Sequence, residues 1–292
     1  MTETYLSSRT PPGDSDVREA SDATLVSVWG SSGSGKTCVA INVAFELARL
    51  DKKVLLVDFD LRRPAIAAWL GLIDAGPGIT AALRLGKSGR LNLDELRRLC
   101  AELKFGGSQL EVMTGLSTPK RWIEVTREAV ISLISSIEGH FDYVVFDLND
   151  EILSDFLINE TGPSRESITS HIIQRSHVVL GTFTADAVGL NRFLFDCKQA
   201  DYEFWPIANR VSFKRRGGSH SRHLRETVQH ITSMSLHSEL PIDSAACDAS
   251  MANARPLLLE SPNSKLTIAI RSLAGAIADQ RISPINSESD QY

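Results

Sequence analysis

Short runs of hydrophobic residues, many of them β-branched, alternate along this chain with longer amphipathic stretches. The short runs predict strands at residues 24–29, 53–59, 110–114, 143–148, 177–183, 205–209 and 234–240. In the longer stretches apolar residues recur every three or four positions, which predicts helices at 37–50, 128–139, 188–200 and 265–279, among others. Strands alternating with helices indicate βαβ units. The predicted fold class is therefore α/β, a doubly wound, mostly parallel sheet with helices on both faces.

The same pattern divides the chain into one domain and two tails. Residues 1–22 are polar and contain Pro-Pro-Gly, which predicts a disordered lead-in. Residues 23–280 show no break in composition and are expected to form a single domain, and residues 281–292 are expected to be a flexible tail. The N-terminus lacks the features of a signal peptide, and no stretch has the ~20 apolar residues that a membrane span needs. We therefore expect a cytoplasmic protein.

Charge and cysteine content narrow the range of partners. The net charge is −5, which argues mildly against nucleic acid as the main partner. Cys38, Cys100, Cys197 and Cys247 are far apart in sequence and form no CxxC pair or metal-ligand cluster. They are expected to be single buried thiols in a reducing compartment.

The stretch that follows the first predicted strand has the spacing of a phosphate-binding loop. It fits G-x-x-x-x-G-K-[ST] at every fixed position, with residues Gly30, Ser31, Ser32, Gly33, Ser34, Gly35, Lys36 and Thr37. Glycines let the backbone curl so that successive N–H groups point at a phosphate, and Lys36 adds a cation. Thr37 can offer its hydroxyl to Mg²⁺ and begins a helix whose N-terminus also favours anions. The sequence predicts nucleotide binding here.

Carboxylates at the ends of two predicted strands complete this site. Asp58 ends the second strand, and Asp60 follows at a spacing of two, so both are expected on one side. Asp147 ends the strongly hydrophobic strand 143–148, as in a Walker B motif. Ligands of open α/β sheets bind at the carboxyl ends of strands, where all three acids would lie. The alternative is that each aspartate only caps the turn that follows it.

Taken in order, these motifs resemble the ParA/MinD family of P-loop ATPases from Thr24 to about Asp279. The P-loop, the strand "VLLVDFD", the Walker B strand and a later strand ending in "ANRV" follow one another as in that family. The segments "VMTGLSTPKRW", "TADAVGLNRF" and "PNSKLTIAIRSLAGAI" resemble most the actinobacterial CpaE/TadZ-like group. That group is associated with Flp/Tad pilus assembly and septum-site regulation.

The resemblance implies ATP and Mg²⁺ as cofactors, an ATP-dependent homodimer and weak hydrolysis. The dimer would act as a switch in spatial positioning, with a protein of the pilus or division machinery as partner. Such a partner would recruit the protein to the cell pole or to the inner face of the membrane. A membrane anchor of its own is not expected, since the acidic C-terminal tail is interrupted by Pro284 and lacks the pairing of basic with bulky apolar residues that an amphipathic membrane helix needs.

The family's residue roles carry over onto matching positions of this chain. Lys36 and Asp60 take the catalytic roles, with Asp60 positioning the attacking water. The metal positions are Thr37, Asp58 and Asp147. The nucleotide contacts fall on residues Gly30 to Thr37, on Cys38 and on Asn209, which matches the asparagine that hydrogen bonds adenine.

Two departures from the family's pattern bear on hydrolysis. Ser31 stands where the family usually has a second lysine that reaches the partner's phosphates across the dimer. The Walker B strand continues as "DLND" in place of a DTPAG-like run. These changes predict slow hydrolysis or binding without turnover, so a non-hydrolysing ATP-bound scaffold is the main alternative.

Two further alternatives stay open. "GSGKT" with "DLRRP" is also typical of bacterial tyrosine kinases, but those end in a tyrosine cluster and this C-terminal tail has only Tyr292. The basic loop 213–223 contains Lys214, Arg215 and Arg216, which can neutralise DNA phosphates as in a partitioning ATPase. A solvated loop is the favoured interpretation because the whole chain is acidic.

Overall fold

A single sheet organises the part of the chain that the structure describes. The computed structural model describes residues 23–280 apart from 73–74, 77, 153–163, 201 and 213–217. Within these residues the strands are β1 (Thr24–Trp29), β2 (Val54–Phe59), β3 (Ala101–Phe105), β4 (Ser108–Met113), β5 (Tyr143–Leu148), β6 (Val178–Thr184), β7 (Trp205–Val211) and β8 (Ser238–Pro241). Their order is β3-β4-β2-β5-β1-β6-β7-β8. Only β3 with β4 is antiparallel, so the predicted fold class is confirmed.

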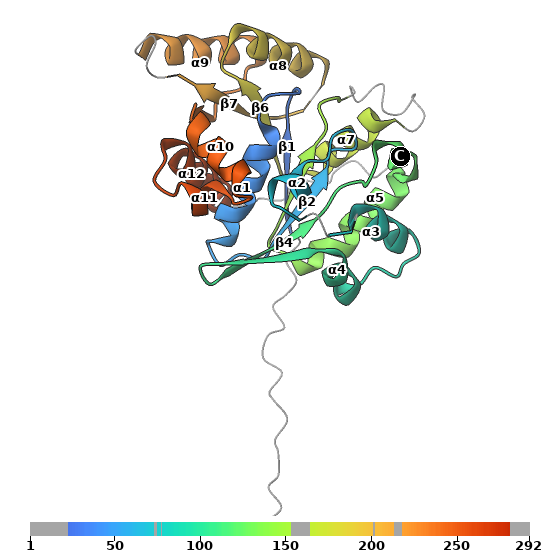
Figure 1. The fold of residues 1–292 in the computed structure, drawn as a ribbon. Coiled ribbons are helices and arrows are strands. Elements are labelled where there is room, and N and C mark those ends of the chain that lie inside the picture. Colours follow the sequence, from blue (N-terminus) through green and yellow to red (C-terminus); the bar gives the residue numbers. More distant parts are fainter. Residues whose placement is uncertain are drawn as a thin grey trace, which may run out of the picture.

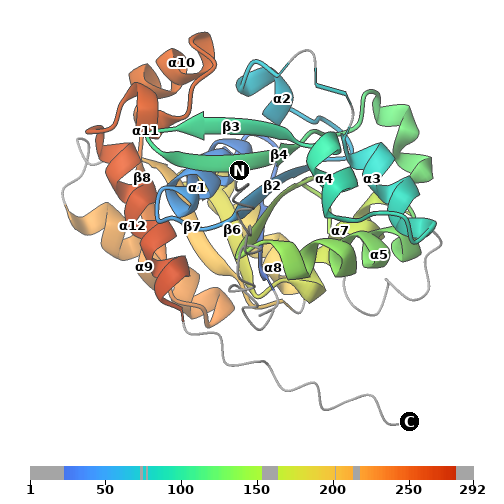
Figure 2. The ribbon, with the colours of Figure 1, turned by 90° about the horizontal axis from the view of Figure 1, so that it is seen from below.

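Helices cover both faces of this sheet (Figure 1). One face carries α1 (Lys36–Ala48), α2 (Ile66–Trp69), α10 (Ser244–Ala252), α11 (Leu257–Glu260) and α12 (Lys265–Asp279). The other carries α3 (Gly78–Lys87), α4 (Leu93–Leu99), α5 (Arg127–Ile137), α7 (Arg165–Arg175), α8 (Ala187–Gln199) and α9 (Gly218–Thr232). Two 3₁₀ turns flank α5: η1 (Pro119–Glu124) and η2 (Glu138–His140). From below, α12 is seen beside α1, far from α3 and α5 (Figure 2).

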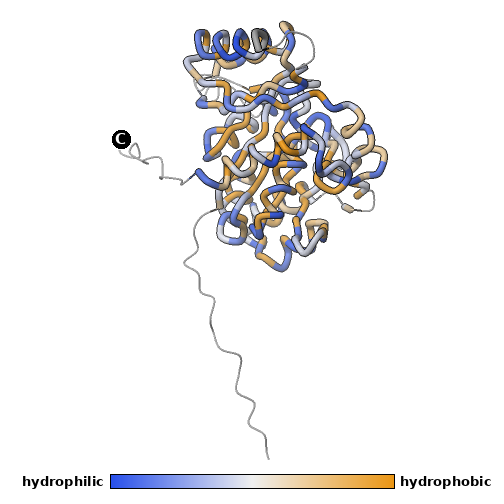
Figure 3. The backbone as a smooth tube through the Cα atoms, turned by 90° about the vertical axis from the view of Figure 1, so that its left-hand side faces the viewer, coloured by the Kyte–Doolittle hydropathy of each residue, from blue (hydrophilic) through white to orange (hydrophobic). Residues whose placement is uncertain are grey.

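Each central strand contributes side chains to two hydrophobic cores, one on each face of the sheet. In β1, Leu25 and Trp29 pack into the core with α8, whereas Val26 and Val28 pack into the core with α1 and α12. Parallel strands covered on both faces are apolar without interruption, which is why the sequence displays them so clearly. Apolar stretches accordingly gather in the middle of the molecule (Figure 3).

Three of the four predicted helices named above, α5, α8 and α12, begin with a polar side-chain cap, whereas α1 begins after Gly35 without one. The prediction 265–279 is confirmed by α12, at whose start the side chain of Ser264 accepts a hydrogen bond from the amide of Thr267. The predictions 37–50, 128–139 and 188–200 are confirmed by α1, α5 and α8 within two residues at each end. Thr126 caps α5 and Asp186 caps α8 in the same way. A capping side chain satisfies an amide that has no partner within the helix.

Two strands differ from the prediction. The last strand begins at Ser238 and not at residue 234, because α9 runs to Thr232 and Ser233 turns the chain with a φ of 60°. Strand β3 was not predicted, because its sequence "AELKF" is not a continuous apolar run like those of the central strands but alternates apolar and polar residues, as a strand at the sheet edge can. The signal for it was Gly106-Gly107, whose φ values of 53° and 89° close a tight hairpin to β4.

Candidate functional site

The predicted phosphate-binding loop lies between β1 and α1 and is shaped by its glycines. Gly33 and Gly35 have φ values of 84° and 89°, a region that other residues rarely adopt. Gly30 packs so closely on β6 that a Cβ atom there would lie 2.0 Å from the carbonyl oxygen of Thr182. The amide of Ser34 donates to the carbonyl of Ser31 at 3.0 Å, which closes the turn. The loop therefore has the curled backbone that phosphate binding requires.

Lys36 begins α1 and contacts one of the predicted carboxylates. Its Nζ lies 3.1 Å from Oδ2 of Asp60, and the two side chains are 11% and 6% exposed. Burial lowers the pKa of Lys36, but the carboxylates of Asp147 and Asp60 outweigh it and raise the pKa overall. Lys36 is therefore a charged, nearly buried cation at the phosphate loop.

Both carboxylate oxygens of Asp60 accept hydrogen bonds. Oδ2 accepts from Lys36, and Oδ1 accepts the backbone amides of Arg62 and Arg63 at 3.0 and 2.8 Å. These bonds fix the chain that follows β2. Oδ2 of Asp60 is therefore open to another partner only if Lys36 leaves it. The ion pair thus links the two residues that were predicted to be catalytic.

Thr37 and Asp147 make the contact that a metal site at a P-loop needs. Thr37 Oγ1 donates to Oδ2 of Asp147 at 2.7 Å. Oδ1 of Asp147 is buried and has no hydrogen-bond partner among the described residues. Burial, only partly offset by Lys36, raises the pKa of Asp147 to about 8. A buried oxygen without a partner is costly unless something binds it.

These residues fit a magnesium ion. Mg²⁺ at nucleotide sites takes one or two protein oxygens and completes its octahedron with water and phosphate. The Thr37 hydroxyl and the free Oδ1 of Asp147 are such oxygens, next to the loop. Within the described ranges no three His, Cys, Asp or Glu side chains converge into a metal cluster of their own. Any ion here would need the phosphates of a nucleotide as further ligands.

Asp58, also predicted as a metal position, is engaged with the backbone. It lies directly opposite Asp147 in the β2–β5 register, so the sheet does bring the two strand ends together. Its Oδ2 accepts the amides of Ala65 and Ile66 at 2.9 and 3.0 Å, where α2 begins. Burial raises its pKa to about 7, against the effect of these hydrogen bonds. Its observed contacts stabilise the segment after β2.

Asn209 reaches the loop because β7 is irregular. The register between β7 and β8 shifts between Ala208 and Val211, and Arg210 has a φ of 57°. Bulges of this kind redirect side chains and are frequent near functional sites. The side-chain Nδ2 of Asn209 donates to the carbonyl of Ser34 at 2.8 Å, and its Oδ1 accepts the amide of Arg210. Asn209 therefore braces the phosphate loop.

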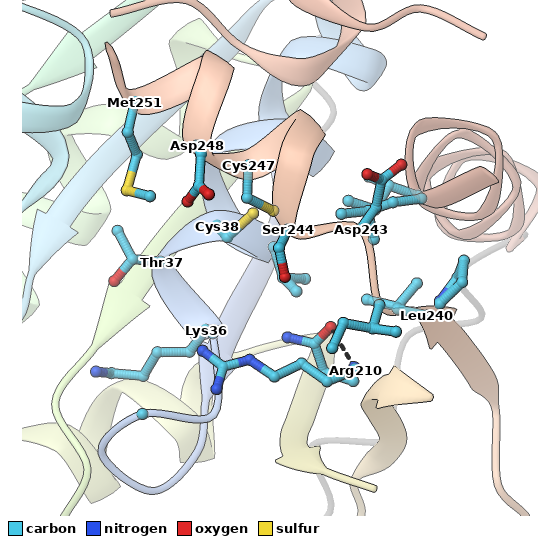
Figure 4. Close-up of a pocket in the computed structure, with 18 of the residues that line it drawn as sticks. Lys36, Thr37, Cys38, Arg210, Leu240, Asp243, Ser244, Cys247, Asp248 and Met251 are labelled. Atoms are coloured by element: carbon cyan, nitrogen blue, oxygen red, sulfur yellow. Dashed lines mark hydrogen bonds between the residues drawn. The ribbon is translucent and has the colours of Figure 1, made fainter. Parts of the chain in front are cut away.

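A cavity of about 530 Å³ opens beside the loop (Figure 4). The predicted residues that line it are Gly33, Gly35, Lys36, Thr37, Cys38 and Asn209. Its opposite wall was missed by the sequence analysis and consists of Arg210, the chain from Leu240 to Ser244, and Cys247, Asp248 and Met251 on α10. The signal for this wall was the end of β8, since cavities of parallel sheets lie at the carboxyl ends of strands. Its volume lies in the range of small-molecule binding sites.

Two arginines after Asp60 hold the segment after β2 in place. Arg63 donates from Nη1 to Oγ of Ser32 in the phosphate loop at 3.0 Å. Arg62 lies 2.8 Å from Glu151 and 3.7 Å from Glu166. The prediction of a DNA contact falls on Lys214, Arg215 and Arg216, which lie outside the described residues.

One correction concerns the cysteines. All four are free thiols, as predicted, but only Cys38 is buried, and Cys100, Cys197 and Cys247 are only partly buried. Cys38 on α1 and Cys247 on α10 both line the cavity, a neighbourhood that the sequence did not show because most of the domain lies between them. A further finding is that none of the described helices is long and apolar enough to cross a membrane.

Fold and site together define a P-loop nucleotide-binding protein of the α/β class. The sequence gives the particular family: residues 25–257 match the CobQ/CobB/MinD/ParA nucleotide binding domain, and the chain belongs to that family. This confirms the predicted ParA/MinD superfamily.

A curated relative is the putative septum site-determining protein MinD of Oltmannsiellopsis viridis. It is 28% identical over 156 residues, which cover 53% of this chain and 46% of that protein. The matched region thus spans about half the length of each protein.

Solved structures confirm the fold. The ParA family ATPase from Chlorobium tepidum is 19% identical, with a TM-score of 0.71 over 87% of this chain and 98% of that one. MinD complexed with Mg-ADP from Pyrococcus horikoshii is 19% identical, with a TM-score of 0.66 over 88% and 96%. MinD in the MinC:MinD complex of Aquifex aeolicus is 18% identical, with a TM-score of 0.62 over 90% and 99%.

Proposed function

We propose that this protein binds ATP with Mg²⁺ and hydrolyses it slowly, as a switch that dimerises when ATP is bound. The observation that carries the proposal is the pair Thr37–Asp147, whose buried Oδ1 has no partner among the described residues and lies beside the curled phosphate loop. Bound Mg²⁺ would neutralise phosphate charge at this point. Nucleotide-linked switching then amounts to a change in affinity between two copies.

The proposed residue roles follow from the contacts. Lys36 leaves Asp60 for the phosphates, and Oδ2 of Asp60 then becomes free to orient water. Thr37 and Asp147 hold the metal, while Asp58 keeps the start of α2 in place. The cavity beside Asn209 takes the nucleoside. We assign all of these roles to one domain over residues 23–280.

The biological role that we propose is spatial positioning, in Tad/Flp pilus assembly or division-site regulation. It rests on the resemblance to the CpaE/TadZ-like group, and the MinD relatives support the second of these settings, since one is described as septum site-determining and another as part of a MinC:MinD complex. The protein would act in the cytoplasm and be recruited to the membrane or pole by a partner.

A second candidate is an ATP-bound scaffold without turnover. It is favoured by the saturation of Asp60, which accepts three hydrogen bonds, and by Ser31 in place of a lysine. If Lys36 stays on Asp60 after ATP binds, no carboxylate is released to orient water.

Binding, turnover and mass in solution test the proposal together. Wild type, Lys36→Ala and Asp60→Ala are compared with Lys52→Ala, which removes an exposed lysine just before β2, at the far end of that strand from the site. We expect Lys36→Ala to lose ATP binding, Asp60→Ala to keep binding but lose turnover, and Lys52→Ala to match wild type. Dimers should form with ATP and not with ADP. Tight ATP binding with no turnover in wild type would favour the scaffold, and no binding at all would reject both.

A further inference from the structure

Cys38 and Cys247 face each other across the nucleotide cavity, although they are 209 positions apart by their residue numbers. Cys38 lies in the first turn of α1, directly after Thr37, and Cys247 lies on α10. Both line the cavity, and Figure 4 shows the two side chains pointing toward each other. Their thiols share a hydrogen bond. The fold thus brings two thiols from distant parts of the chain together at one cavity.

The surroundings make the pair unequal. Cys38 is buried, and its sulfur accepts a hydrogen bond from Nδ2 of Asn42 at 3.6 Å. Cys247 is partly exposed to the cavity. The hydrogen bond from Cys38 lowers the pKa of the Cys247 thiol, and the Arg210 guanidinium acts in the same direction. The thiolate is the reactive form of cysteine, so Cys247 is the accessible nucleophile.

The two remaining cysteines provide a contrast within the same chain. Burial raises the pKa of Cys100 and of Cys197 to about 12 in each case. Neither lines the cavity. A thiol that is protonated and isolated reacts slowly with oxidants. Of the four cysteines, only Cys247 has a thiol whose pKa is lowered, and Cys38 lies beside it.

We propose that Cys38 and Cys247 form a reversible disulfide that closes the nucleotide cavity. The oxidant is a hydroperoxide. The Cys247 thiolate attacks its O–O bond, becomes a sulfenic acid and releases hydroxide. Cys38 then attacks the Cys247 sulfur, the S–O bond breaks, and the Cys38 proton leaves with the second oxygen as water. Two thiols and one peroxide give one disulfide and two waters, and a dithiol reverses the reaction.

The consequence for ligand binding rests on the proposed function. A disulfide would tie α10 to the first turn of α1 and hold Met251 and Asp248 over the space that the nucleoside needs. Nucleotide should then bind less tightly to the oxidised protein. Linkage requires the reverse as well, so bound nucleotide should shift the thiol–disulfide equilibrium toward the two thiols.

Peptide mass mapping after treatment with hydrogen peroxide tests the disulfide directly and without nucleotide. Full-length wild type should lose two hydrogens and show a linked pair of peptides that contain Cys38 and Cys247. Cys197→Ser should behave in the same way, and Cys247→Ser should form no link. If peroxide leaves Cys38 and Cys247 unlinked while it oxidises other residues, the proposal is wrong.

Nucleotide titration before and after oxidation tests the consequence. We expect affinity for ATP to fall at least about fivefold on oxidation and to return with dithiothreitol, with no change in Cys247→Ser. A linked protein with unchanged affinity would overturn closure of the cavity. If the reduced protein binds no nucleotide, the proposed function fails, yet the mapping still decides whether the disulfide forms.

Discussion

The two ends of the nucleotide cavity are built in different ways. The phosphate end is one continuous segment, Gly30 to Thr37, held by buried partners such as Asp60 and Asp147. The other end is assembled from the end of β8 and from α10, with Ile242 and Met251 53% and 47% exposed. The first end depends on backbone geometry and buried charge. The second end is formed by partly exposed apolar side chains.

This difference predicts where a substitution should have the larger effect on ligand binding and on stability. At Gly30 and Gly35 of the phosphate end, a single extra carbon atom must displace backbone or a buried polar group, which is costly. At the α10 end a truncation removes only contacts with a ligand, since the side chains are already solvated in the free protein. Substitutions at the two ends should therefore differ in size and in their effect on stability.

The largest effect is expected at Gly35. Gly35→Ala puts a Cβ atom into a φ of 89° and within 2.3 Å of Nδ2 of Asn209, which must leave the carbonyl of Ser34. Strain of roughly 2 kcal/mol in the loop corresponds to a loss of ATP affinity of about thirtyfold. Isothermal titration on the folded variant measures it.

Gly33→Ala is the matched control for that substitution. Its φ of 84° is equally unfavourable, but a Cβ there meets nothing within 4 Å. The difference between the two variants isolates the contact with Asn209. Equal losses would mean that φ alone matters and that Asn209 does not brace the loop.

A smaller loss is expected from Thr37→Val, which keeps the shape and removes the hydroxyl. Both oxygens of Asp147 then lack a partner among the described residues. ATP affinity in the presence of Mg²⁺ should fall about tenfold, while affinity in EDTA should barely change. Thr182→Val is the control, because the Thr182 hydroxyl is buried without a partner among the described residues and its loss should cost nothing. A loss that is equal with and without Mg²⁺ would contradict the metal role.

At the α10 end the expected effect is smaller again. Ile242→Ala should weaken ATP binding about fivefold, the value of roughly 1 kcal/mol of apolar contact. The unfolding free energy should hardly change, since Ile242 is 53% exposed in the free protein. Ile123→Ala, 73% exposed and outside the cavity, should change neither quantity. If Ile242→Ala binds ATP as wild type does, this end does not contact the nucleoside.

The two ends of the cavity also differ in how far they could be predicted from the sequence. Gly30 to Thr37 is contiguous, so spacing alone located the phosphate end, and Asp147 was visible because its strand is uniformly apolar. The α10 end could not be predicted residue by residue. Arg210 and Met251 line the same cavity only because of the bulge in β7 and the return of the chain after β8. The Cys38–Cys247 contact has the same origin. Side-chain partners such as those of Asp58 required the loop geometry as well.

The substitution expected to change nucleotide affinity least lies outside both ends, and it sets the pH range in which the two ends can be compared. His171 on α7 is buried, and neither ring nitrogen has a hydrogen-bond partner among the described residues. Burial, with Arg127 and Arg175 nearby, lowers its pKa from 6.5 to about 4. Between pH 6.5 and about pH 4, the unfolded chain binds a proton at His171 that the folded protein does not bind. Neutral His171 therefore contributes fully to the free energy of unfolding above pH 6.5, and this contribution is lost as pH falls toward 4.

The free energy of unfolding of wild type should thus drop by roughly 2 kcal/mol more than that of His171→Leu between pH 7 and pH 4. Urea unfolding of both proteins at several pH values measures this difference. A constant gap between the two curves would mean that His171 does not titrate in this range. If the gap changes as expected, nucleotide affinities at the two ends should be compared above pH 6.5, where the protonation of His171 no longer changes the stability of the free protein.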